Sequence, residues 1–499
     1  MPALRFTRNS RSVARAARTS LFALLLLLLL TPGSARAAEA PAPDLAAGAA
    51  GHWEGELDLP QNLGKLQVMV DLRREGGAWT GTIDIPMQGA KGLPLEDVAI
   101  QDGKVHFKIK GIPGVPTFDG TLADSPPQVI QGTFTQAGTS LHFRLGRDPV
   151  AKPVRLQEPK PPFPYTAEEV TYTNGGVKLA GTLTLPPGDG PFPAVVLITG
   201  SGAQDRDESL LGHKPFLVLA DHLSRHGIAV LRADDRGVGG STGSVPESTT
   251  ADFAQDALAG VRFLKTHPRI AKDRIGLLGH SEGGVAAPLA ASQSSDVAFV
   301  VMLAGTGVPG PEVLLLQNER ISRAEGTPED KIQKQLAVTR RLMDVIRTEQ
   351  DPAARQAKLR QAAQEDAAAM TADELRTAGG ADSVVERNVR LFDSPWFRYF
   401  LAYDPRPALR QVKVPVLALN GDLDLQVIAD QNLPEIEKAL KESGNKDFTL
   451  KRLPGLNHLF QPAKTGSPSE YAKIEVTIDP LVLDTVTGWI TERFGTDKR

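Results

Sequence analysis

Residues 276–284 read GLLGHSEGG and contain the pattern G-x-S-x-G, with Ser281 at its centre. The apolar run Ile275–Leu278 that leads into it is typical of a buried strand, and the small residues after Gly283 favour a helix. A strand that turns sharply into a helix crowds its own backbone, so glycine is needed on both sides of the turn. The stretch therefore predicts a strand, a tight turn and a helix, with the Ser281 hydroxyl exposed at the turn.

A second match to the same pattern, Gly239–Gly243, has Ser241 at its centre. It follows a polar, glycine-rich run, residues 233–239, with no strand directly before it. Such a run indicates a loop, and one chance match is unsurprising in a chain with 47 glycines. Ser281 is therefore preferred as the chemically active serine.

A serine hydroxyl is a weak nucleophile and needs a histidine to accept its proton, with an acid to orient the imidazole. Where a serine occupies such a turn, the acid and then the histidine follow it along the chain. His458 is the only one of the nine histidines after Ser281, and it follows the predicted strand Phe448–Leu453. We interpret His458 as the base, the alternative being a solvent-exposed loop histidine.

The acid is expected just after the preceding strand, where Asp422 and Asp424 follow the apolar run Val416–Leu419. Residue patterns alone leave both aspartates open.

Two backbone N–H groups should stabilise the negative oxygen that develops during attack. One belongs to Glu282, directly after the serine. The other is assigned to Ser201, with Gly202 as the alternative, in the loop that follows the predicted strand ending at Ile198. Adjacent residues on a tight turn point apart, so His280 is expected to form a wall of the substrate pocket.

The remaining sequence divides into segments of different pattern. Short runs with period-two alternation predict a barrel or sandwich of about eight strands, and a proline-rich stretch follows it. Strands then alternate with helices, which indicates an α/β domain with a mostly parallel sheet, interrupted by a charged, alanine-rich helical insertion. The predicted bounds are 48–148 for the β-rich domain, 149–166 for the linker, 167–499 for the α/β domain and about 309–402 for the insertion.

Residues 1–37 have the features of a secretory signal peptide: a basic start without acids, a short apolar run and the A-x-A site Ala35–Ala37. Cleavage would remove six arginines and change the formal net charge from −3 to −9. We therefore expect an exported protein, periplasmic or secreted, with no membrane span in the mature chain and no nucleic-acid partner. The chain has no cysteine, and no metal-ligand or cofactor-binding motif is evident, so neither a metal nor a cofactor is expected.

Several motifs in their order along the chain resemble the α/β-hydrolase superfamily, and specifically exported bacterial carboxylesterases with an N-terminal β-rich domain. They are ITGSGAQDRDE, GHKPFLVLADHL, RADDRGVGGSTG, GHSEGG, SPWFRYFLAYDP, LNGDLDLQV and LPGLNHLFQ, within residues 170–494. The resemblance implies an eight-stranded sheet with helices on both faces. It also implies hydrolysis of small carboxylic esters through an acyl-enzyme, by a Ser-Asp-His triad.

The family pattern G-x-x-D-x-x-V falls on Gly421, Asp424 and Val427, and so favours Asp424 over Asp422 as the acid. The sequence departs from many relatives in having Thr199-Gly200 where they have His-Gly before the oxyanion-hole amide.

Two rival activities share this fold, those of an acyl-CoA thioesterase and of a prolyl-oligopeptidase-like serine peptidase. Export disfavours the first, because acyl-CoA is cytoplasmic, and the second usually carries a large β-propeller. A different class of function is glycan or cell-wall binding by an inactive hydrolase fold, which the complete set of triad residues disfavours.

The helical insertion is expected to form a lid over the carboxyl ends of the sheet. Its aromatic residues Trp396, Phe397, Tyr399 and Phe400 would then line the acyl pocket, with Trp396 and Phe400 as the main candidates. The alternative is that these rings only pack the lid against the core.

Overall fold

The computed structural model describes residues 46–58, 65–85, 90–112, 115–123, 128–136, 139–148, 155–378 and 380–495. The predicted signal peptide, residues 1–37, lies outside the described residues, as does the first part of the predicted linker. Within the described ranges, no helix is long and apolar enough to cross a membrane.

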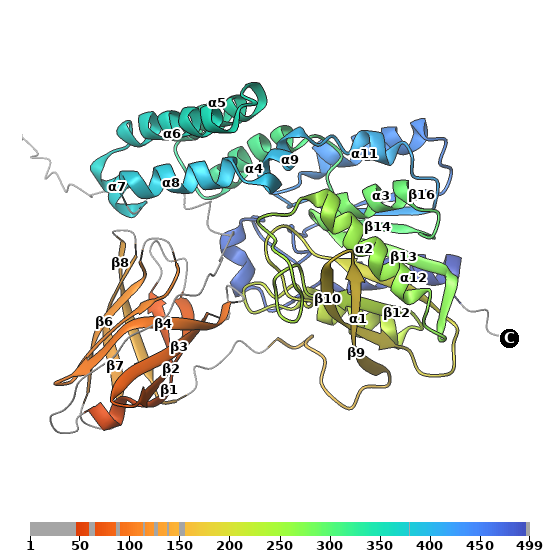
Figure 1. Cartoon of the computed structure of the whole chain (residues 1–499). Coiled ribbons are helices and arrows are strands. Elements are labelled where there is room, and N and C mark those ends of the chain that lie inside the picture. Colours follow the sequence, from red (N-terminus) through yellow and green to blue (C-terminus); the bar gives the residue numbers. More distant parts are fainter. Residues whose placement is uncertain are drawn as a thin grey trace, which may run out of the picture.

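The N-terminal part is a closed barrel of eight antiparallel strands, each paired with the next in sequence (Figure 1). Pairing of Gly55 with Leu145 joins the first strand to the last and closes the barrel. Alternate residues point inward and are buried, and Phe118 packs at its centre against Phe107 and Phe143. The strands are β1 Gly51–Asp58, β2 Lys65–Glu75, β3 Ala78–Ile85, β4 Ala90–Gln101, β5 Lys104–Ile109, β6 Thr117–Leu122, β7 Val129–Gln136 and β8 Thr139–Gly146.

One end of the barrel is closed by the short 3₁₀ helix η1 (Ala46–Ala49) and by two stacked side chains. The indole of Trp53 is fully buried and donates to the Ala49 carbonyl at 2.8 Å. The Arg147 guanidinium lies 3.6 Å from the centre of the Trp53 ring and donates to the carbonyl of Ala50. These contacts fill the barrel end with a cation stacked on an aromatic ring.

The C-terminal part contains a second sheet of eight strands, in the order β16-β15-β14-β13-β11-β12-β10-β9. Strand β10 is antiparallel to both of its neighbours, β9 and β12, and all other neighbouring strands pair in parallel, which confirms the mostly parallel eight-stranded sheet. The strands are β9 Thr166–Asn174, β10 Val177–Leu185, β11 Phe192–Ile198, β12 Ala229–Ala233, β13 Ile270–His280, β14 Val300–Leu303, β15 Val416–Gly421 and β16 Phe448–Leu453.

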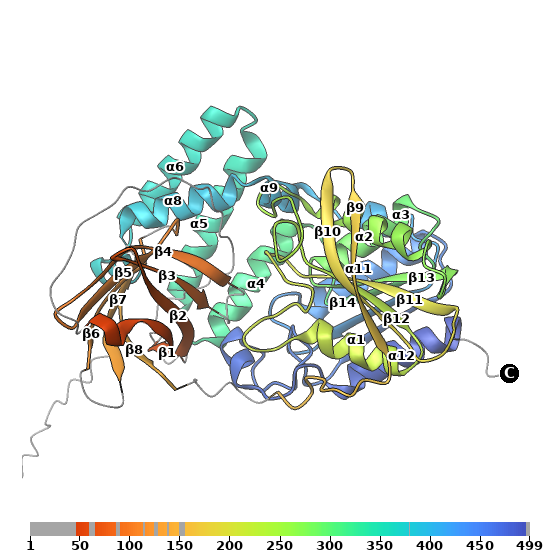
Figure 2. The ribbon, with the colours of Figure 1, turned by 60° about the horizontal axis from the view of Figure 1, so that its bottom comes forward.

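Helices cover both faces of this sheet, as the predicted fold class requires (Figure 2). Side chains alternate along β11, so that Val195 packs with helices on one face and Val196 with helices on the other. The first face carries α1 (Pro215–Arg225) and α12 (Pro480–Phe494). The second carries α2 (Thr250–Leu264), α3 (Gly283–Gln293), α10 (Arg406–Leu409) and α11 (Ala429–Glu442).

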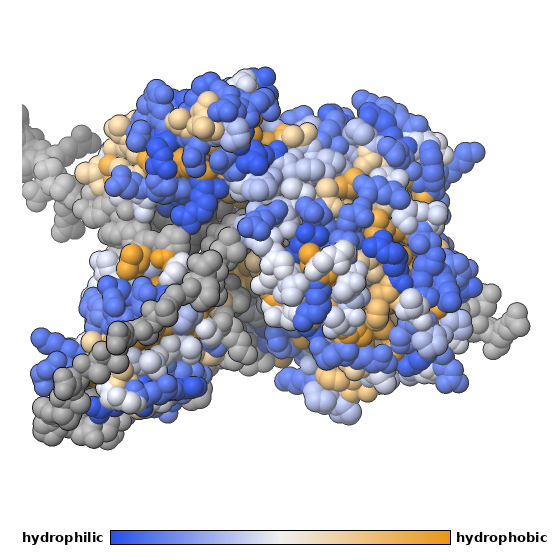
Figure 3. Space-filling view, viewed as in Figure 1, coloured by the Kyte–Doolittle hydropathy of each residue, from blue (hydrophilic) through white to orange (hydrophobic). Residues whose placement is uncertain are grey.

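The insertion between β14 and β15 is helical, as expected, and has an apolar core of its own. The surface over α5 and α6 is mostly hydrophilic (Figure 3), although Arg355 and Asp366 of α6 are buried. The helices are α4 Gly310–Ala324, α5 Glu329–Thr348, α6 Pro352–Ala368, α7 Ala372–Thr377, α8 Ala381–Phe392 and α9 Pro395–Ala402.

The described part of the predicted linker is anchored on the α/β domain rather than extended away from it. Arg155 is 6% exposed, and its guanidinium donates to the carbonyls of Leu211, Ala472 and Ile474. Gln157 accepts the backbone N–H of Thr477 at 2.6 Å. Residues from Arg155 onward therefore belong to the surface of the α/β domain.

We predict that Arg155→Ala lowers the free energy of unfolding by about 2–4 kcal/mol, because several buried carbonyls lose a charged donor. Urea denaturation of the purified protein measures the change. Lys160→Ala, at an exposed position of the same segment, serves as the control and should change it by less than about 0.5 kcal/mol. Equal stability of the two variants would contradict the anchoring role of Arg155.

Candidate active site

The turn between β13 and α3 holds Ser281 in a left-handed backbone conformation, with φ of 54°. Its N–H donates to the carbonyl of Leu303 on the neighbouring strand at 2.8 Å. The two flanking glycines are required by contact: a Cβ on Gly279 would lie 1.9 Å from the Gly283 carbonyl oxygen. A Cβ on Gly283 would lie 2.0 Å from the carbonyl oxygen of Ile198. The structure thus gives the G-x-S-x-G pattern a steric cause.

His458 and Asp424 meet in a buried contact beyond the carboxyl ends of β16 and β15. The Nδ1 of His458 lies 2.9 Å from Asp424 Oδ2, and the two residues are 4% and 2% exposed. Asp424 also accepts the backbone N–H groups of Gln426 and Val427 through Oδ1, and the Asn420 side-chain amide through Oδ2. Four donors therefore fix the carboxylate and stabilise its charge.

Asp422, the other candidate acid, has a local role instead. Its Oδ1 accepts the backbone N–H of Gly455 at 2.6 Å, which joins the loop after β15 to the loop after β16. In the structure, the carboxylate of Asp422 therefore connects two loops.

Ser241, the serine of the rival motif, is buried and engaged on both sides. Its hydroxyl donates to the Asp234 carbonyl at 2.8 Å and accepts the N–H of Ala180 at 2.9 Å. These hydrogen bonds hold the loop of Ser241 against β10. Ser241 does not lie on a strand-to-helix turn.

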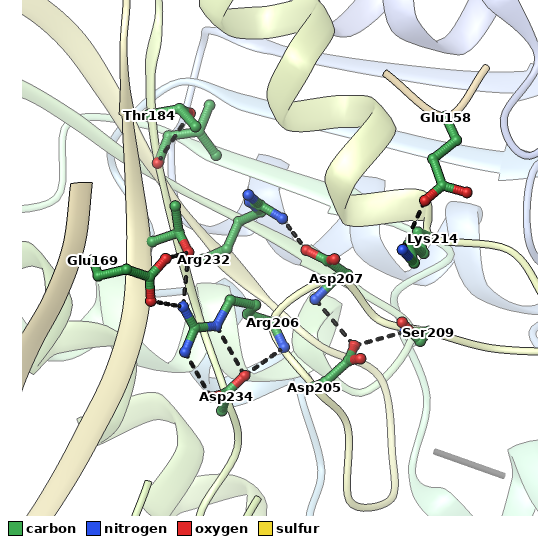
Figure 4. Close-up of polar contacts among 12 residues, drawn as sticks. Glu158, Glu169, Thr184, Asp205, Arg206, Asp207, Ser209, Lys214, Arg232 and Asp234 are labelled. Carbon is green, nitrogen blue, oxygen red and sulfur yellow. Dashed lines mark hydrogen bonds and ion pairs between the residues drawn. The ribbon is translucent and has the colours of Figure 1, made fainter. Parts of the chain in front are cut away.

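The loop after β11, residues 199–209, passes beside the Ser281 turn and is held by charged residues. The Arg206 guanidinium makes a two-pronged contact with Asp234, and Arg232 pairs with Asp207 (Figure 4). Asp235 accepts the Thr199 hydroxyl at 2.7 Å, and burial raises the pKa of its carboxyl well above the usual range. The motifs RADDRG and ITGSGAQDRDE are thus two halves of one polar network.

This network brings Gly200 against the serine, since a Cβ on Gly200 would lie 3.4 Å from the Ser281 Cβ. The N–H of Gly200 donates to Glu208 Oε1 at 2.7 Å and is therefore occupied. The N–H groups of Ser201 and Glu282, predicted to bind an oxyanion, have no protein acceptor in the described part of the chain.

The Glu282 side chain joins the Ser281 turn to two helices. Its Oε1 accepts the Thr250 hydroxyl of α2 at 2.6 Å and the Trp396 indole N–H of α9 at 2.8 Å. Burial raises the pKa of Glu282, against the opposite effect of these two hydrogen bonds. Trp396 in turn stacks on Phe400, with ring centroids 5.6 Å apart. The structure therefore places the predicted lid residue Trp396 next to the serine turn.

A cavity of about 50 Å³ lies beside this contact. Glu282 and Gly200 line it together with residues of β11, β12, α2 and α3, and Trp396 and Phe400 are not among its described lining residues.

His280 points inward, behind the serine, and both of its ring nitrogens have partners. Nδ1 lies 3.0 Å from Glu208 Oε1, and Nε2 lies 3.0 Å from the His458 carbonyl oxygen. His280 also lines a small cavity together with Glu208 and Phe460, and its expected place in the substrate pocket stays a prediction. Glu208 was not predicted as a site residue, although it is the last residue of the motif ITGSGAQDRDE. Its partner, His280, lies 72 residues further along the chain, so no local pattern indicates the contact.

No group of three or more histidine, aspartate or glutamate side chains suited to a metal ion occurs among the described residues.

The sheet order, the strand-to-helix turn at Ser281 and the loops at the strand ends define an α/β-hydrolase. A family model described as X-Pro dipeptidyl-peptidase (S15 family) matches residues 175–452. This match spans more than half of the chain, and the protein belongs to that family.

Among curated relatives, esterase EstD of Thermotoga maritima is 28% identical over 334 residues, which cover 66% of this chain and 69% of the relative. The mitochondrial acyl-coenzyme A thioesterase 2 of Mus musculus is 28% identical over 178 residues, 35% of each chain. Among solved structures, an esterase of Pyrococcus furiosus has a TM-score of 0.41 at 18% identity, covering 67% of this chain and 92% of that one.

We predict that Gly283→Ala prevents correct folding of the turn or lowers the free energy of unfolding by more than about 4 kcal/mol, because its new methyl group would overlap the Ile198 carbonyl. Urea denaturation provides the measurement. Gly488→Ala is the matched control, since this exposed helical glycine has no atom within 4 Å of the added Cβ. The control should gain about 0.5–1 kcal/mol, and a Gly283→Ala protein of parental stability would refute the steric account.

Proposed function

We propose that this protein is a serine hydrolase that cleaves carboxylic esters through an acyl-enzyme intermediate. Ser281 is the nucleophile, His458 the base and Asp424 the acid. The observation that carries the proposal is the buried contact of 2.9 Å between His458 and Asp424, on loops at the same edge of the sheet as the Ser281 turn. An aspartate at Nδ1 leaves Nε2 of the imidazole free to accept a proton from a serine.

In the proposed reaction, the Ser281 hydroxyl loses its proton to His458 Nε2 as its oxygen bonds to the ester carbonyl carbon. The carbonyl oxygen becomes negative and accepts the N–H groups of Glu282 and Ser201. The tetrahedral intermediate collapses, the C–O bond to the alcohol breaks, and His458 returns the proton to the leaving oxygen. Water then repeats these steps on the acyl-serine, which releases the acid and restores Ser281.

Two neighbouring activities compete with this assignment. The family model is named for X-Pro dipeptidyl-peptidase, and several relatives are named acyl-coenzyme A thioesterases. A curated relative that matches over 334 residues is named an esterase. Ester hydrolysis is favoured because that match extends over two thirds of the relative, and because the proposed signal peptide would separate the enzyme from acyl-CoA.

The test of function is a substrate panel on the purified full chain: nitrophenyl esters, an acyl-CoA and X-Pro peptide amides, with a fluorophosphonate label for the serine. We expect turnover of esters, and labelling that Ser281→Ala abolishes. Turnover of peptide amides alone would reassign the protein as a peptidase. An unreactive serine would favour the binding protein with an inactive hydrolase fold.

The two loop aspartates provide the sharpest test of the triad. Asp424→Asn should lower kcat by roughly 10⁴-fold, because its amide no longer holds the imidazole in the tautomer that accepts the serine proton. Asp422→Asn is the matched control and should stay within about tenfold of the parent, since it loses a loop contact. Steady-state kinetics on a nitrophenyl ester, with circular dichroism to confirm the fold, gives both values. The reverse ranking would assign the acid role to Asp422.

The proposed lid role of Trp396 and Phe400 predicts a change in chain-length preference. Trp396→Ala and Phe400→Ala should each shift the kcat/KM ratio of octanoyl over acetyl ester by about threefold or more, because apolar wall is removed. Phe392→Leu, in the insertion core, is the control for lost packing and should lower stability without changing the ratio. An unchanged ratio in both pocket variants would leave these rings with a packing role only.

A further inference from the structure

Glu208 occupies a strained position in the loop after β11. Its φ of 52° lies in the left-handed region, which residues with a Cβ seldom adopt. The Asp205 carboxylate accepts the N–H groups of Asp207 and Ser209 at 3.1 and 2.9 Å and so fixes the turn around Glu208 (Figure 4). Strain of this kind persists only where the surrounding structure enforces it. Its effect here is to direct the Glu208 side chain inward, where the residue is 4% exposed.

The inward carboxylate joins three separate segments. Glu208 Oε1 accepts the N–H of Gly200 at 2.7 Å and lies 3.0 Å from His280 Nδ1. The other nitrogen of His280 lies 3.0 Å from the carbonyl oxygen of His458. A single hydrogen-bonded chain therefore runs from the oxyanion loop through the residue before the serine to the backbone of the proposed base.

The protonation state follows from the partners of His280. A carbonyl oxygen and a carboxylate are both acceptors, whereas a neutral imidazole has only one N–H. An imidazolium beside an ionised Glu208 satisfies every atom of the chain. Burial lowers the pKa of His280, but the charge and hydrogen bond of Glu208, the His458 carbonyl and the charge of Asp424 raise it, and the net direction is upward.

We propose that Glu208 and His280 form a buried ion pair that positions the reactive groups, by holding the oxyanion loop and the His458 loop against the Ser281 turn. The inference rests on the proposed function, because it assigns the pair a role in that reaction. His458 is then held twice, at its ring by Asp424 and at its main chain by His280.

Other groups around His280 are consistent with this role. The His458 ring lies beside it, with ring centroids 4.9 Å apart, and Phe460 approaches it edge-on at 6.4 Å. The groups whose charges act on His280 are Glu208 and Asp424, both acidic. An imidazolium at this position therefore has its counter-charge supplied from the oxyanion loop and from the acid loop.

The first experiment measures the pH dependence of the Glu208→Gln protein. The amide keeps an oxygen for the Gly200 N–H but cannot neutralise an imidazolium. We expect kcat to fall by about ten- to a hundredfold with KM within about threefold, as for a small misplacement of reacting groups.

The sign of the pH effect follows from the direction of the pKa. Below the pKa of His280 both ring N–H groups are present and both acceptors are bound; as the pH rises through this pKa one N–H is lost, and with it one of the two hydrogen bonds. Without the carboxylate this pKa falls, so the decline of kcat/KM at alkaline pH should begin at least one pH unit lower than in the parent. Glu208→Asp should restore part of the profile. Glu158→Gln, which removes a surface ion pair with Lys214, should leave the profile unchanged. A Glu208→Gln profile that superimposes on that of the parent would overturn the positioning role.

The second experiment observes the ion pair without substrate and without altering it. In the full-length Ser281→Ala protein labelled with ¹⁵N-histidine, NMR should show both ring nitrogens of His280 protonated at pH 7, where an ordinary histidine is mostly neutral. A neutral His280 in a chain whose parent hydrolyses esters would overturn the ion pair and leave the proposed function intact. A charged His280 in a chain whose parent turns over no substrate of the panel would support the ion pair and refute the proposed function.

Discussion

The left-handed backbone at Ser281 is the constraint on which the site depends. A non-glycine residue in this conformation costs on the order of 1–3 kcal/mol. Two local contacts hold the turn in this strained conformation. The Ser281 N–H donates to the carbonyl of Leu303, and Gly283 packs closely against Ile198. Both contacts reach neighbouring strands, so the turn is supported from β14 on one side and β11 on the other. Any shift of those strands would move the serine with them.

Ion pairs between charged side chains fix the loops that follow β11 and β12 near this turn. Strands β11 and β12 end at Ile198 and Ala233, and the segments beyond them are polar. Ion pairs of Arg206 with Asp234, and of Arg232 with Asp207, connect the loop after β11 to β12 and to the segment that follows it. Buried ion pairs of this kind stabilise a fold weakly but select one arrangement of the groups they join. A proposed site with two backbone N–H groups beside a serine depends on one fixed arrangement of its loops, which such ion pairs select.

Local pattern was enough to predict much of the fold and of the candidate site. The glycines around Ser281, the alternation of strands with helices and the loop position of His458 each follow from a few consecutive residues. The choice of Asp424 needed the family resemblance, because Asp422 lies in the same loop and has the same chemistry.

Contacts between distant segments could not be predicted. Glu208 and His280 are 72 residues apart, and Arg155 donates to a carbonyl 319 residues away. The backbone strain that directs Glu208 inward has no signature in residue type either, since φ above zero is unusual for glutamate. Nothing in the local pattern marks His280 as the partner of Glu208, so this contact was not predicted.

Glu282 connects the proposed oxyanion site with the helical insertion. Its backbone N–H is proposed to stabilise the oxyanion, while its carboxylate receives the Trp396 indole from the insertion. Because α9 belongs to the insertion, this hydrogen bond joins the insertion to the Ser281 turn. A shift of α9 would then act on the amide beside Ser281 through a single side chain. Because Glu282 Oε2 is buried without a hydrogen-bond partner in the described part of the chain, the carboxylate depends on Trp396 and Thr250 for its solvation. In the observed position of α9, this buried acid keeps one of its two side-chain donors.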